Sequence, residues 1–492
     1  MAHDNVDELL GGSSLKTPTY PSNCLAFLNQ SAPKPLTNKA KVHLNIIVVG
    51  AGLGGLSTAI ALASTGHTVT VYEQAPELGE VGAGIQIPSN STRLLSKLGL
   101  DQYLTPHVTE PSQISFRRWE SGAVIGLTRL IPDFRDTFGA PYYVIHRANF
   151  HSALHARAVE LGVVVKLASR VVRYTNDSNP FGETGRAGIC LVDGRFVCAD
   201  LVVASDGVKS IARELVDQSG RPIERTGFAA YRATVDVSKI QADPEISWLL
   251  ERPALNIWYH TLPPPHYSRN QLTISNDRIG DQRHVMTYTI NSGKSFNMVL
   301  SHPDNTDPAS WDQTTALRDM RREFQGWDSR LQKIISMITN TIKWPLVSGT
   351  PLPRWTAGRI VMLGDAAHAM LPYMSQGAAM AVEDAIALST SLSKLTSTHD
   401  LPTALSIFEK ARIDRTSKMQ EASLLNGKLW HFADGPLQRA RDAAMKPEVD
   451  GVGFSHSPNQ WSDPVTQIWT YGYDAEGAVE RAWREYRVKC AL

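Results

Sequence analysis

The chain has 492 residues, 42% of them hydrophobic and 20% charged, so it is long enough for two or three domains with a substantial core. Its 49 basic and 48 acidic residues nearly cancel, which excludes the basic surface of a nucleic-acid-binding protein and a polybasic membrane anchor. Four cysteines are too few for a disulfide scaffold, and the sequence holds no Cys/His cluster with the spacing of metal ligands.

Residues 1–43 are polar and without periodicity, which predicts a mobile N-terminal extension. Its first residues lack the basic start and apolar core of a signal peptide. The run 44–66 carries no charged residue, yet its glycines divide it into a strand, a turn and a helix, which argues against a membrane span. We therefore expect a cytoplasmic protein with no membrane partner. A targeting signal that a receptor recognises for import into an organelle stays open as an alternative.

The next segments alternate between strand and helix patterns. We expect strands at 45–49, 67–73, 163–174, 189–192, 196–199 and 201–204, and helices at 56–64 and 149–161. Asp193-Gly194 indicates a two-residue hairpin turn, which would place Cys190 opposite Val197 and Ile189 opposite Cys198. The two thiols would then face opposite sides and could not bridge, which favours a reducing compartment.

A second sheet is predicted after residue 227. Apolar and polar residues alternate over 231–237, which is the pattern of a half-buried antiparallel strand. Helices follow within 312–338 and at 376–395, with a strand at 359–363 between them. The fold class is therefore α/β: a Rossmann-like domain in two parts, 44–226 and 346–429, around an inserted and mostly antiparallel sheet domain at 227–345. A helical region rich in Trp and Tyr, 430–492, is expected to pack on the surface.

The first chemical motif is Gly50-Ala-Gly52-Leu-Gly54-Gly55, which follows a predicted strand and opens a predicted helix. Gly50 permits a tight turn, Gly52 lets the backbone approach a pyrophosphate, and Gly55 lets helix and strand pack closely. Glu73 ends the second strand, where a carboxylate can accept ribose hydroxyls. A glycine-rich turn without a ligand is the alternative, but the strand, the helix and the acid together favour a dinucleotide site.

Two further loops follow buried strands. Asp206-Gly207 comes after 201–204, and by itself it is read more simply as an ordinary turn. Asp365 comes after 359–363, where its carboxylate could accept hydrogen bonds from a polyol chain; a capped helix after a strand is the alternative. We expect His368 to be a packed, hydrogen-bonded residue rather than a catalytic base.

Gly377 and Ala378 begin the long helix predicted at 376–395. The N–H groups of a first helical turn and the helix dipole would stabilise an anion lying against them. These two positions are therefore candidates for contact with a negatively charged group.

In this order, the three motifs resemble the signatures of the group A flavoprotein monooxygenases, the single-component FAD-dependent aromatic hydroxylases. The segments GAGIQIPSN (82–90), IHR (145–147), AYRA (230–233) and YGYDAEGAVERAW (471–483) are similar to the salicylate-hydroxylase-like branch found in fungi. The resemblance extends from residue 44 to the C-terminus. It is specific for the fold and the flavin but not for the substrate.

The resemblance implies a set of cofactor-binding residues distributed along FAD. They are Gly50, Gly52 and Gly55 at the pyrophosphate, Glu73 at the adenosine ribose, Gly84 and Arg147 along the path of the flavin, Asp206 at both FAD and the passing nicotinamide, Asp365 at the ribityl chain, and Gly377 and Ala378 at the pyrimidine end of the ring. Pro372 would lie near the reacting face of the flavin.

The family chemistry implies non-covalent FAD that is reduced by NADH or NADPH. Reduced flavin and O2 then form a hydroperoxide that hydroxylates a small phenolic or other electron-rich aromatic substrate, in secondary metabolism or aromatic degradation. A single GxGxxG agrees with a nicotinamide that binds only in passing. Two alternatives stay open: an epoxidase of olefins in a terpenoid or polyketide pathway, and a flavoprotein that transfers no oxygen. The oligomeric state is not indicated.

Arg232 and Tyr288 match positions that hold the substrate phenolate in related fungal enzymes, and they are the predicted catalytic residues. An arginine at a sheet edge and a cross-strand tyrosine are the simpler alternatives. The family-like sequence is interrupted by 259–278, which contains three consecutive prolines. We expect this segment to be a surface loop or a translated intron, and to be dispensable for folding.

Overall fold

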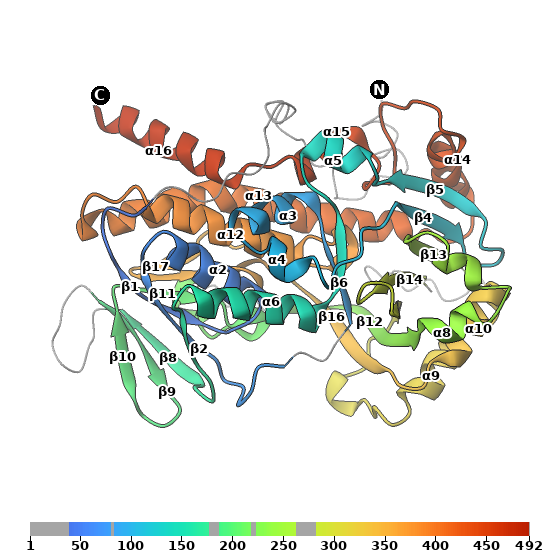
Figure 1. Ribbon diagram of the computed structural model, residues 1–492, viewed down its shortest axis with the longest axis horizontal. Coiled ribbons are helices and arrows are strands. Elements are labelled where there is room, and N and C mark those ends of the chain that lie inside the picture. The colour runs from blue at the N-terminus through green and yellow to red at the C-terminus, as the bar shows by residue number, and fades with distance from the viewer. Residues whose placement is uncertain (1–38, 80–82, 177–185, 218–222, 262–281, 492) are drawn as a thin grey trace, which may run out of the picture.

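The computed structural model describes residues 39–79, 83–176, 186–217, 223–261 and 282–491. Most of the predicted extension 1–43 and of the interrupting segment 259–278 therefore lies outside the described residues. Across the described ranges, no helix is both long and apolar enough to cross a membrane. Figure 1 shows two sheet-containing halves side by side, with long C-terminal helices lying across both.

The first half is built on a six-stranded sheet with the order β17 (Thr356–Ala357), β18 (Ile360–Met362), β11 (Leu201–Ala204), β1 (Asn45–Val49), β2 (Thr68–Tyr72), β7 (Val164–Lys166). All neighbouring pairs except β17–β18 are parallel. Helix α2 (Leu53–Ser64) packs against α6 (Arg147–Glu160) and α12 (Gly377–Leu392) beside this sheet. The α/β unit predicted from the sequence is therefore present.

A separate three-stranded sheet corrects two sequence expectations. The strand predicted at 163–174 is two strands in different sheets, β7 and β8 (Val171–Asn176), because Ala168 has a left-handed φ of +48° between them. Strands β9 (Ala187–Leu191) and β10 (Phe196–Ala199) form the predicted hairpin with a different register.

The hairpin between β9 and β10 has a three-residue loop, not a two-residue one. The N–H of Leu191 donates to the carbonyl of Arg195 at 2.9 Å, and Gly194 between them has a φ of +87°. Cys190 therefore pairs with Phe196, and Cys198 pairs with Gly188. Because Gly188 and Cys190 are two residues apart on one strand, both thiols face the same side. The prediction of opposite faces was wrong.

The second half is a seven-stranded sheet with the order β16 (Ile342–Gly349), β12 (Ile223–Asp236), β15 (Ser295–Pro303), β14 (Gln282–Ile290), β13 (Leu255–Thr261), β4 (Gln113–Arg118), β5 (Val124–Arg129). It is antiparallel except where β13 meets β4. Strands β4 and β5 precede residue 227, so the sheet extends beyond the range 227–345; the division into domains stays a prediction. Tyr259 lies buried in β13, so the expectation that 259–278 contributes nothing to the core was wrong at its first residue.

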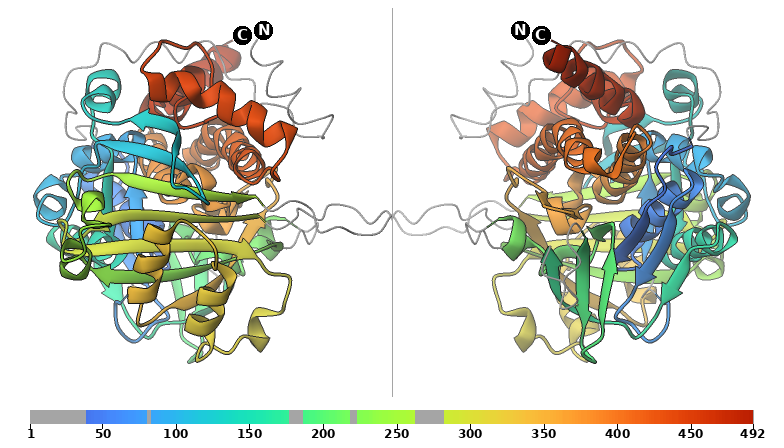
Figure 2. Two further views of the ribbon diagram at one scale, coloured as in Figure 1. Left: turned by 90° about the vertical axis from the view of Figure 1, so that its right-hand side faces the viewer. Right: turned by 90° about the vertical axis from the view of Figure 1, so that its left-hand side faces the viewer.

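The two faces of this sheet are covered differently. Helices α9 (Ala316–Glu323) and α10 (Ser329–Met337) pack on one face with Tyr231, Trp258 and Phe296 of the strands. The other face meets α13 (Leu401–Trp430) and the C-terminal region through aromatic residues such as Trp430 and Trp461. Figure 2 shows the sheet between these layers.

The C-terminal region is helical, with α14 (Pro436–Asp450), α15 (Pro464–Tyr471) and α16 (Ala475–Ala491). Its aromatic residues Trp461, Trp469 and Tyr471 are buried in the core shared with the sheet, so this region does more than lie on the surface. The remaining elements are β3 (Gly84–Ile87), β6 (Tyr143–His146), α3 (Ser89–Lys97), α4 (Asp101–Leu104), α5 (Asp133–Phe138), α7 (Arg213–Val216), α8 (Val237–Gln241), α11 (Asp365–His368) and the short 3-10 helices η2 (Gly207–Lys209), η3 (Ser247–Leu250), η4 (Pro308–Ser310), η5 (Pro372–Met374) and η6 (Thr398–Asp400).

Candidate active site

The predicted cofactor loops meet at one edge of the six-stranded sheet. Strands β18, β11, β1 and β2 are adjacent and parallel, so their carboxyl ends share this edge. Asp365 follows β18, Asp206 follows β11, Gly50 follows β1, and Glu73 follows β2. Ligands of open α/β sheets bind outside the carboxyl ends of the strands, which is where these loops lie.

The glycines of the first loop are required by close packing. Gly50 has a φ of +97°, and a Cβ there would collide with the carbonyl oxygen of Ser205 in the neighbouring loop. A Cβ on Gly55 would collide with the carbonyl oxygen of Gly50. At Gly52, by contrast, an added Cβ would meet nothing within 4 Å. The start of α2 is therefore open on the side where a pyrophosphate could approach its N–H groups.

Glu73 holds the end of this loop in place. Its Oε2 accepts a hydrogen bond from the Ala51 N–H at 2.7 Å, and its Oε1 accepts one from the Ala75 N–H at 2.9 Å. A carboxylate has about four acceptor sites, so each oxygen can still accept a bond from a ribose hydroxyl. The carboxylate can thus both order the loop and bind a ligand.

Asp206 lies in a half-buried position next to Tyr174, whose hydroxyl donates to Asp206 Oδ2 at 2.8 Å. Its Oδ1 is buried and has no hydrogen-bond partner among the described residues. Burial raises the pKa of Asp206, while the hydrogen bond from Tyr174 opposes that rise. An unpaired carboxylate oxygen at this edge fits a ligand that brings its own donor.

The second and third loops are tied to each other. Arg213, at the end of the Asp206 loop, donates from Nε to the carbonyl of Ala366 at 2.8 Å and from a terminal nitrogen to the carbonyl of Asp365 at 3.1 Å. The carboxylate of Asp365 is thereby left to face the adjoining cavity, which it lines.

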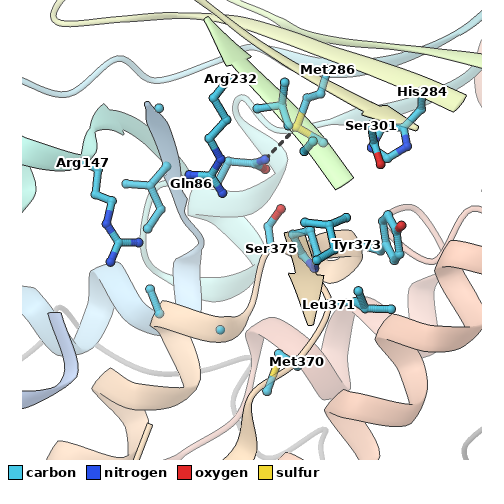
Figure 3. Close-up of a pocket in the computed structure, with 18 of the residues that line it drawn as sticks. Gln86, Arg147, Arg232, His284, Met286, Ser301, Met370, Leu371, Tyr373 and Ser375 are labelled. Atoms are coloured by element: carbon cyan, nitrogen blue, oxygen red, sulfur yellow. Dashed lines mark hydrogen bonds between the residues drawn. The ribbon is translucent and has the colours of Figure 1, made fainter. Parts of the chain in front are cut away.

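A cavity of about 220 Å³ lies between this edge and the seven-stranded sheet. Eight of the residues predicted from the sequence line it together: Gly84, Arg147, Arg232, Tyr288, Asp365, Pro372, Gly377 and Ala378. Gly50, Gly52, Gly55, Glu73 and Asp206 lie outside its lining, along the sheet edge. Figure 3 shows Arg147 and Arg232 at one end of the cavity and His284, Ser301 and Tyr373 at the other.

The roof of the cavity is formed by alternate residues of three adjacent strands. Ala230, Ser301 and His284 oppose one another across β12, β15 and β14, and so do Arg232, Val299 and Met286. The residues between them, such as Tyr231, belong to the core on the opposite face. The period of two in a strand therefore assigns these six side chains to the cavity.

Arg232 is the principal charge in the roof. Its Nε is buried without a hydrogen-bond partner in the described part of the chain. Burial lowers the pKa of its guanidinium, and Tyr288 nearby acts in the opposite direction. Burial raises the pKa of the Tyr288 phenol above its ordinary value, and Arg232 partly offsets that rise. An uncompensated cation in a dry site favours an anionic ligand.

Tyr288 is placed by an unusually close contact with Gly84. A Cβ on Gly84 would lie 2.8 Å from Tyr288 Oη and 2.9 Å from Asn297 Cγ. The Gly84 N–H donates to Asn297 Oδ1 at 2.6 Å, and Asn297 faces Tyr288 across β15 and β14. Gly84 therefore acts by allowing the tyrosine ring to approach the backbone of β3.

The floor opposite Arg232 is the start of α12 and the turn before it. Gly377 and Ala378 present the first N–H groups of the helix at the cavity, next to Pro372. Ser375 has a left-handed φ of +54°, a strained conformation for a residue with a side chain. This arrangement places positive helix-end potential against the cavity.

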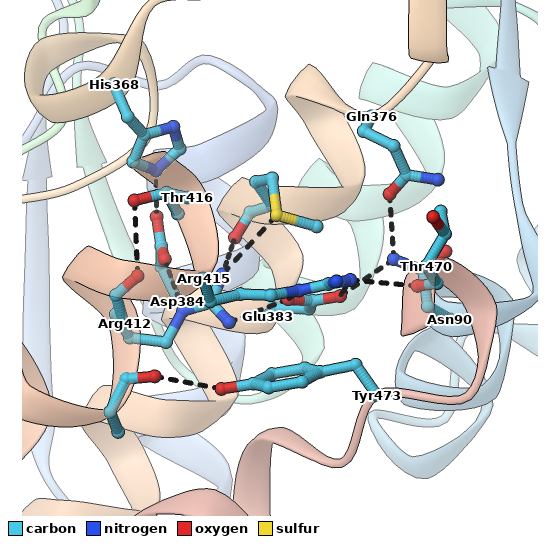
Figure 4. Close-up of polar contacts among 12 residues, drawn as sticks. Asn90, His368, Gln376, Glu383, Asp384, Arg412, Arg415, Thr416, Thr470 and Tyr473 are labelled. Carbon is cyan, nitrogen blue, oxygen red and sulfur yellow. Dashed lines mark hydrogen bonds and ion pairs between the residues drawn. The ribbon is translucent and has the colours of Figure 1, made fainter. Parts of the chain in front are cut away.

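A buried ionic cluster supports the floor from below (Figure 4). Asp384 on α12 accepts hydrogen bonds from the Gly364 N–H at 3.0 Å and from Arg412 Nε at 2.8 Å, and it contacts His368 Nε2 at 2.6 Å. Glu383 beside it is paired with Arg412 and Arg415. These contacts fix the Asp365 loop and α12 relative to α13, and they place His368 as a packed residue.

Sequence reasoning did not identify His284, Ser301, Tyr373 and Gln86, which also line the cavity. His284 is four residues before Tyr288 on the same strand, so strand periodicity could have indicated that it shares the face of Tyr288. Ser301 is assigned to the roof only by its pairing with Ala230, which no local pattern reveals.

The fold and the loops together define an oxidoreductase built around a dinucleotide cofactor, with a second sheet closing its reaction cavity. Residues 43–423 match a family described as FAD binding domain. The FAD-dependent monooxygenase OpS4 of Beauveria bassiana is 33% identical over 89% of this chain and 97% of its own length. The 3-hydroxybenzoate 6-hydroxylase 1 of Aquipseudomonas alcaligenes is 31% identical over 88% and 98%. The solved structure of a salicylate hydroxylase substrate complex has a TM-score of 0.68 and 23% identity, and the match covers 90% of this chain and 98% of that chain.

The chain belongs to this family, and it is an FAD-dependent monooxygenase of the aromatic-hydroxylase group, as the sequence motifs predicted. The residues present fit FAD: the open start of α2 at Gly52, the remaining acceptor sites of Glu73 and the unpaired Oδ1 of Asp206 lie along one edge. Asp365, Gly377 and Ala378 continue this line into the cavity. The roles of the individual residues stay predictions.

Proposed function

We propose that the protein hydroxylates a small phenolic compound, using NADH or NADPH and O2. The observation that carries this proposal is the unpaired Nε of Arg232, which lies beside Tyr288 in the roof and opposite the start of α12. One relative is named as a hydroxylase of 3-hydroxybenzoate and another as a hydroxylase of hispidin, which supports a hydroxylated aromatic as the substrate class.

When bound and reduced, FAD would activate dioxygen and supply the oxygen atom that enters the ring. Arg232 would hold the substrate oxygen as a phenolate, because a fixed guanidinium in a dry site stabilises an anion. Tyr288, with its pKa raised by burial, would stay protonated and donate a hydrogen bond to the same oxygen. Electron density released by the phenolate makes the ring more nucleophilic.

The apolar lining would keep water out of the reaction. Ile85, Met286, Val299, Leu346, Met370 and Leu371 surround the space between roof and floor. Their side chains bind water weakly or not at all, so the substrate would displace solvent at little cost. Arg147 and Asp365 would stay with the cofactor: burial lowers the pKa of Arg147, and the nearby carboxylate of Asp365 opposes that change.

The test is oxidation of NADH and NADPH by the purified holoenzyme with hydroxybenzoates, hydroxybenzaldehydes, resorcinols and matched rings without a hydroxyl. We expect stimulation by phenols and products heavier by one oxygen atom, with the label coming from isotopic O2. An epoxidised olefin, or reduction of the flavin with no oxygenated product from any compound, would overturn the proposal.

Arg232→Ala should lower hydroxylation about a hundredfold while the FAD content stays normal, because an interaction of ~2–4 kcal/mol with the phenolate is removed. Tyr288→Phe should lose less and release more hydrogen peroxide per NAD(P)H. Thr234→Ala on the same strand is the matched control, since Thr234 is exposed. Wild-type turnover and coupling in Arg232→Ala would mean that another group anchors the substrate.

A further inference from the structure

A second cavity lies behind the far end of the active-site cavity. It has a volume of about 420 Å³, and the side chains of Leu371 and Tyr373 line both cavities. Figure 3 shows both side chains at the end of the active-site cavity that lies away from Arg147 and Arg232. Leu371 and Tyr373 thus form a wall one residue thick between the two cavities, which we call the partition.

The backbone of the partition is held by α13. The Ser423 hydroxyl donates a hydrogen bond to the carbonyl of Leu371 at 2.5 Å, and Asn426 Nδ2 donates one to the carbonyl of Tyr373 at 2.6 Å. Both donors are buried side chains, so breaking these bonds would leave buried polar groups unpaired. The backbone is therefore fixed, and the shape of the partition depends on its two side chains.

The ring of Tyr373 is seated against Gly427 of α13. A Cβ on Gly427 would lie 2.6 Å from Cδ2 and 2.7 Å from Cε2 of this ring, so only glycine permits such a close approach. Trp430 and His431 contact the ring edge-on, with centroids 5.6 and 5.5 Å away. The ring is therefore tightly packed in the position that separates the two cavities.

The second cavity has an apolar interior and a polar rim. Phe228 and Leu371 are buried in its lining, whereas Glu224, Thr350 and Glu421 in the same lining are exposed. An apolar group that entered this cavity would leave water and gain contacts with the buried side chains, while the charged rim stayed hydrated. The cavity thus suits an aryl or alkyl group.

We propose that Tyr373 is a specificity-determining residue that limits the substrate to a single ring. The inference rests on the proposed function, in which Arg232 holds the phenol oxygen at the opposite end. A substituent para to that oxygen would point toward the partition, and the seated ring of Tyr373 stops it there. Without this ring the two cavities would join, and the second cavity would take an aryl or alkyl substituent.

The test measures binding to the oxidised holoenzyme through the flavin absorbance, with 4-methylphenol, 4-phenylphenol and 2-phenylphenol as probes. We expect the wild-type protein to bind 4-phenylphenol about tenfold or more weakly than 4-methylphenol. Tyr373→Ala should bind 4-phenylphenol about a hundredfold more tightly than the wild type does, because its second ring becomes buried. The gain for 2-phenylphenol should be smaller, since its extra ring does not point toward the partition.

Three further variants separate the partition from a general loosening of the core. Leu371→Ala opens the same wall by a smaller change, and it serves if Tyr373→Ala does not fold. Leu424→Ala enlarges the second cavity but leaves the partition intact, so it should bind 4-phenylphenol as weakly as the wild type. Tyr373→Phe keeps the ring, and it should keep the weak binding of 4-phenylphenol.

Gly427→Ala tests the seating of the ring from the other side. Because the backbone of Tyr373 is held, its ring would have to turn away from α13 and into the active-site cavity, which should weaken binding of 4-methylphenol about tenfold. In the Tyr373→Ala background no ring is left to displace, so the same substitution should have no effect. An equal loss in both backgrounds would overturn the role of Gly427 in placing the partition.

The size limit would be overturned if the wild-type protein bound 4-phenylphenol as tightly as 4-methylphenol, or if neither Tyr373→Ala nor Leu371→Ala gained affinity for it. Equal gains for 4-phenylphenol and 2-phenylphenol would refute the orientation set by Arg232 and leave the partition standing. The proposed function alone would fail if the probes bound as expected and none of them yielded a hydroxylated product with NADH or NADPH.

Discussion

Replacing Gly84 with alanine should displace the Tyr288 ring by about an ångström. The new Cβ would lie 2.9 Å from Asn297 Cγ and 2.8 Å from Tyr288 Oη. Both distances are well below the ~3.5–4.0 Å at which non-bonded carbon atoms pack. Tyr288 is 2% exposed and packed in the core, so its ring can move only toward the cavity that it lines. Overpacking of this kind costs ~1–3 kcal/mol of folding free energy.

The displacement should affect catalysis more than folding. A shift of ~1 Å in a group that positions the substrate can cost about a hundredfold in rate. Denaturant unfolding and turnover of Gly84→Ala would measure both effects, with Gly79→Ala as the control because an added Cβ there meets nothing within 4 Å. Substituting Tyr288 with leucine in the Gly84→Ala background should recover stability but not turnover. A Gly84→Ala protein with wild-type stability and turnover would refute the close-packing argument.

Three other predictions concern the supporting structure. Burial raises the pKa of Glu448 from 4.5 to about 7, so folding favours the protonated form of this carboxyl group. The free energy of unfolding should therefore fall by about 3 kcal/mol as the pH rises from below 4.5 to above 7. In Glu448→Gln, the free energy of unfolding measured in urea should depend less on pH. Asp384→Asn should cost ~3–5 kcal/mol in urea unfolding, because it leaves buried Arg412 partly unpaired, while Asp414→Asn in an exposed pair should change nothing measurable. Denaturation should release free FAD, and Glu73→Ala should weaken FAD binding in a flavin-fluorescence titration; flavin retained on the chain would contradict a non-covalent link.

The cofactor edge could be predicted from the sequence because each of its parts is local. A strand, a glycine loop and a helix follow one another within about 20 residues, and the carboxyl ends of parallel strands must share an edge. The same strand periodicity correctly separated Tyr231 from Arg232. These predictions needed no knowledge of which distant segments pair.

The predictions failed where pairing or packing is non-local. One extra loop residue at Val192 shifted the β9–β10 register, which reversed the expected face of Cys198. Strands β4 and β5 join a sheet whose other strands begin about a hundred residues later, and no local pattern indicates that parallel contact with β13. His284 and His431 are 147 residues apart, so their contact exists only in the folded chain.

In the strands that form the roof of the cavity, residues that face the cavity alternate along the sequence with residues that stabilise the core. The alternate residues of β12, β15 and β14 that form the roof line the cavity, while their neighbours Tyr231, Val285 and Leu300 pack with α9 and α10. Substitutions at the cavity positions can therefore change which aromatic ring is accepted without disturbing the layer behind them. Related proteins could therefore change their substrates through substitutions at a few alternate positions of these three strands. A library of variants restricted to those positions would sample new substrates while leaving the fold intact.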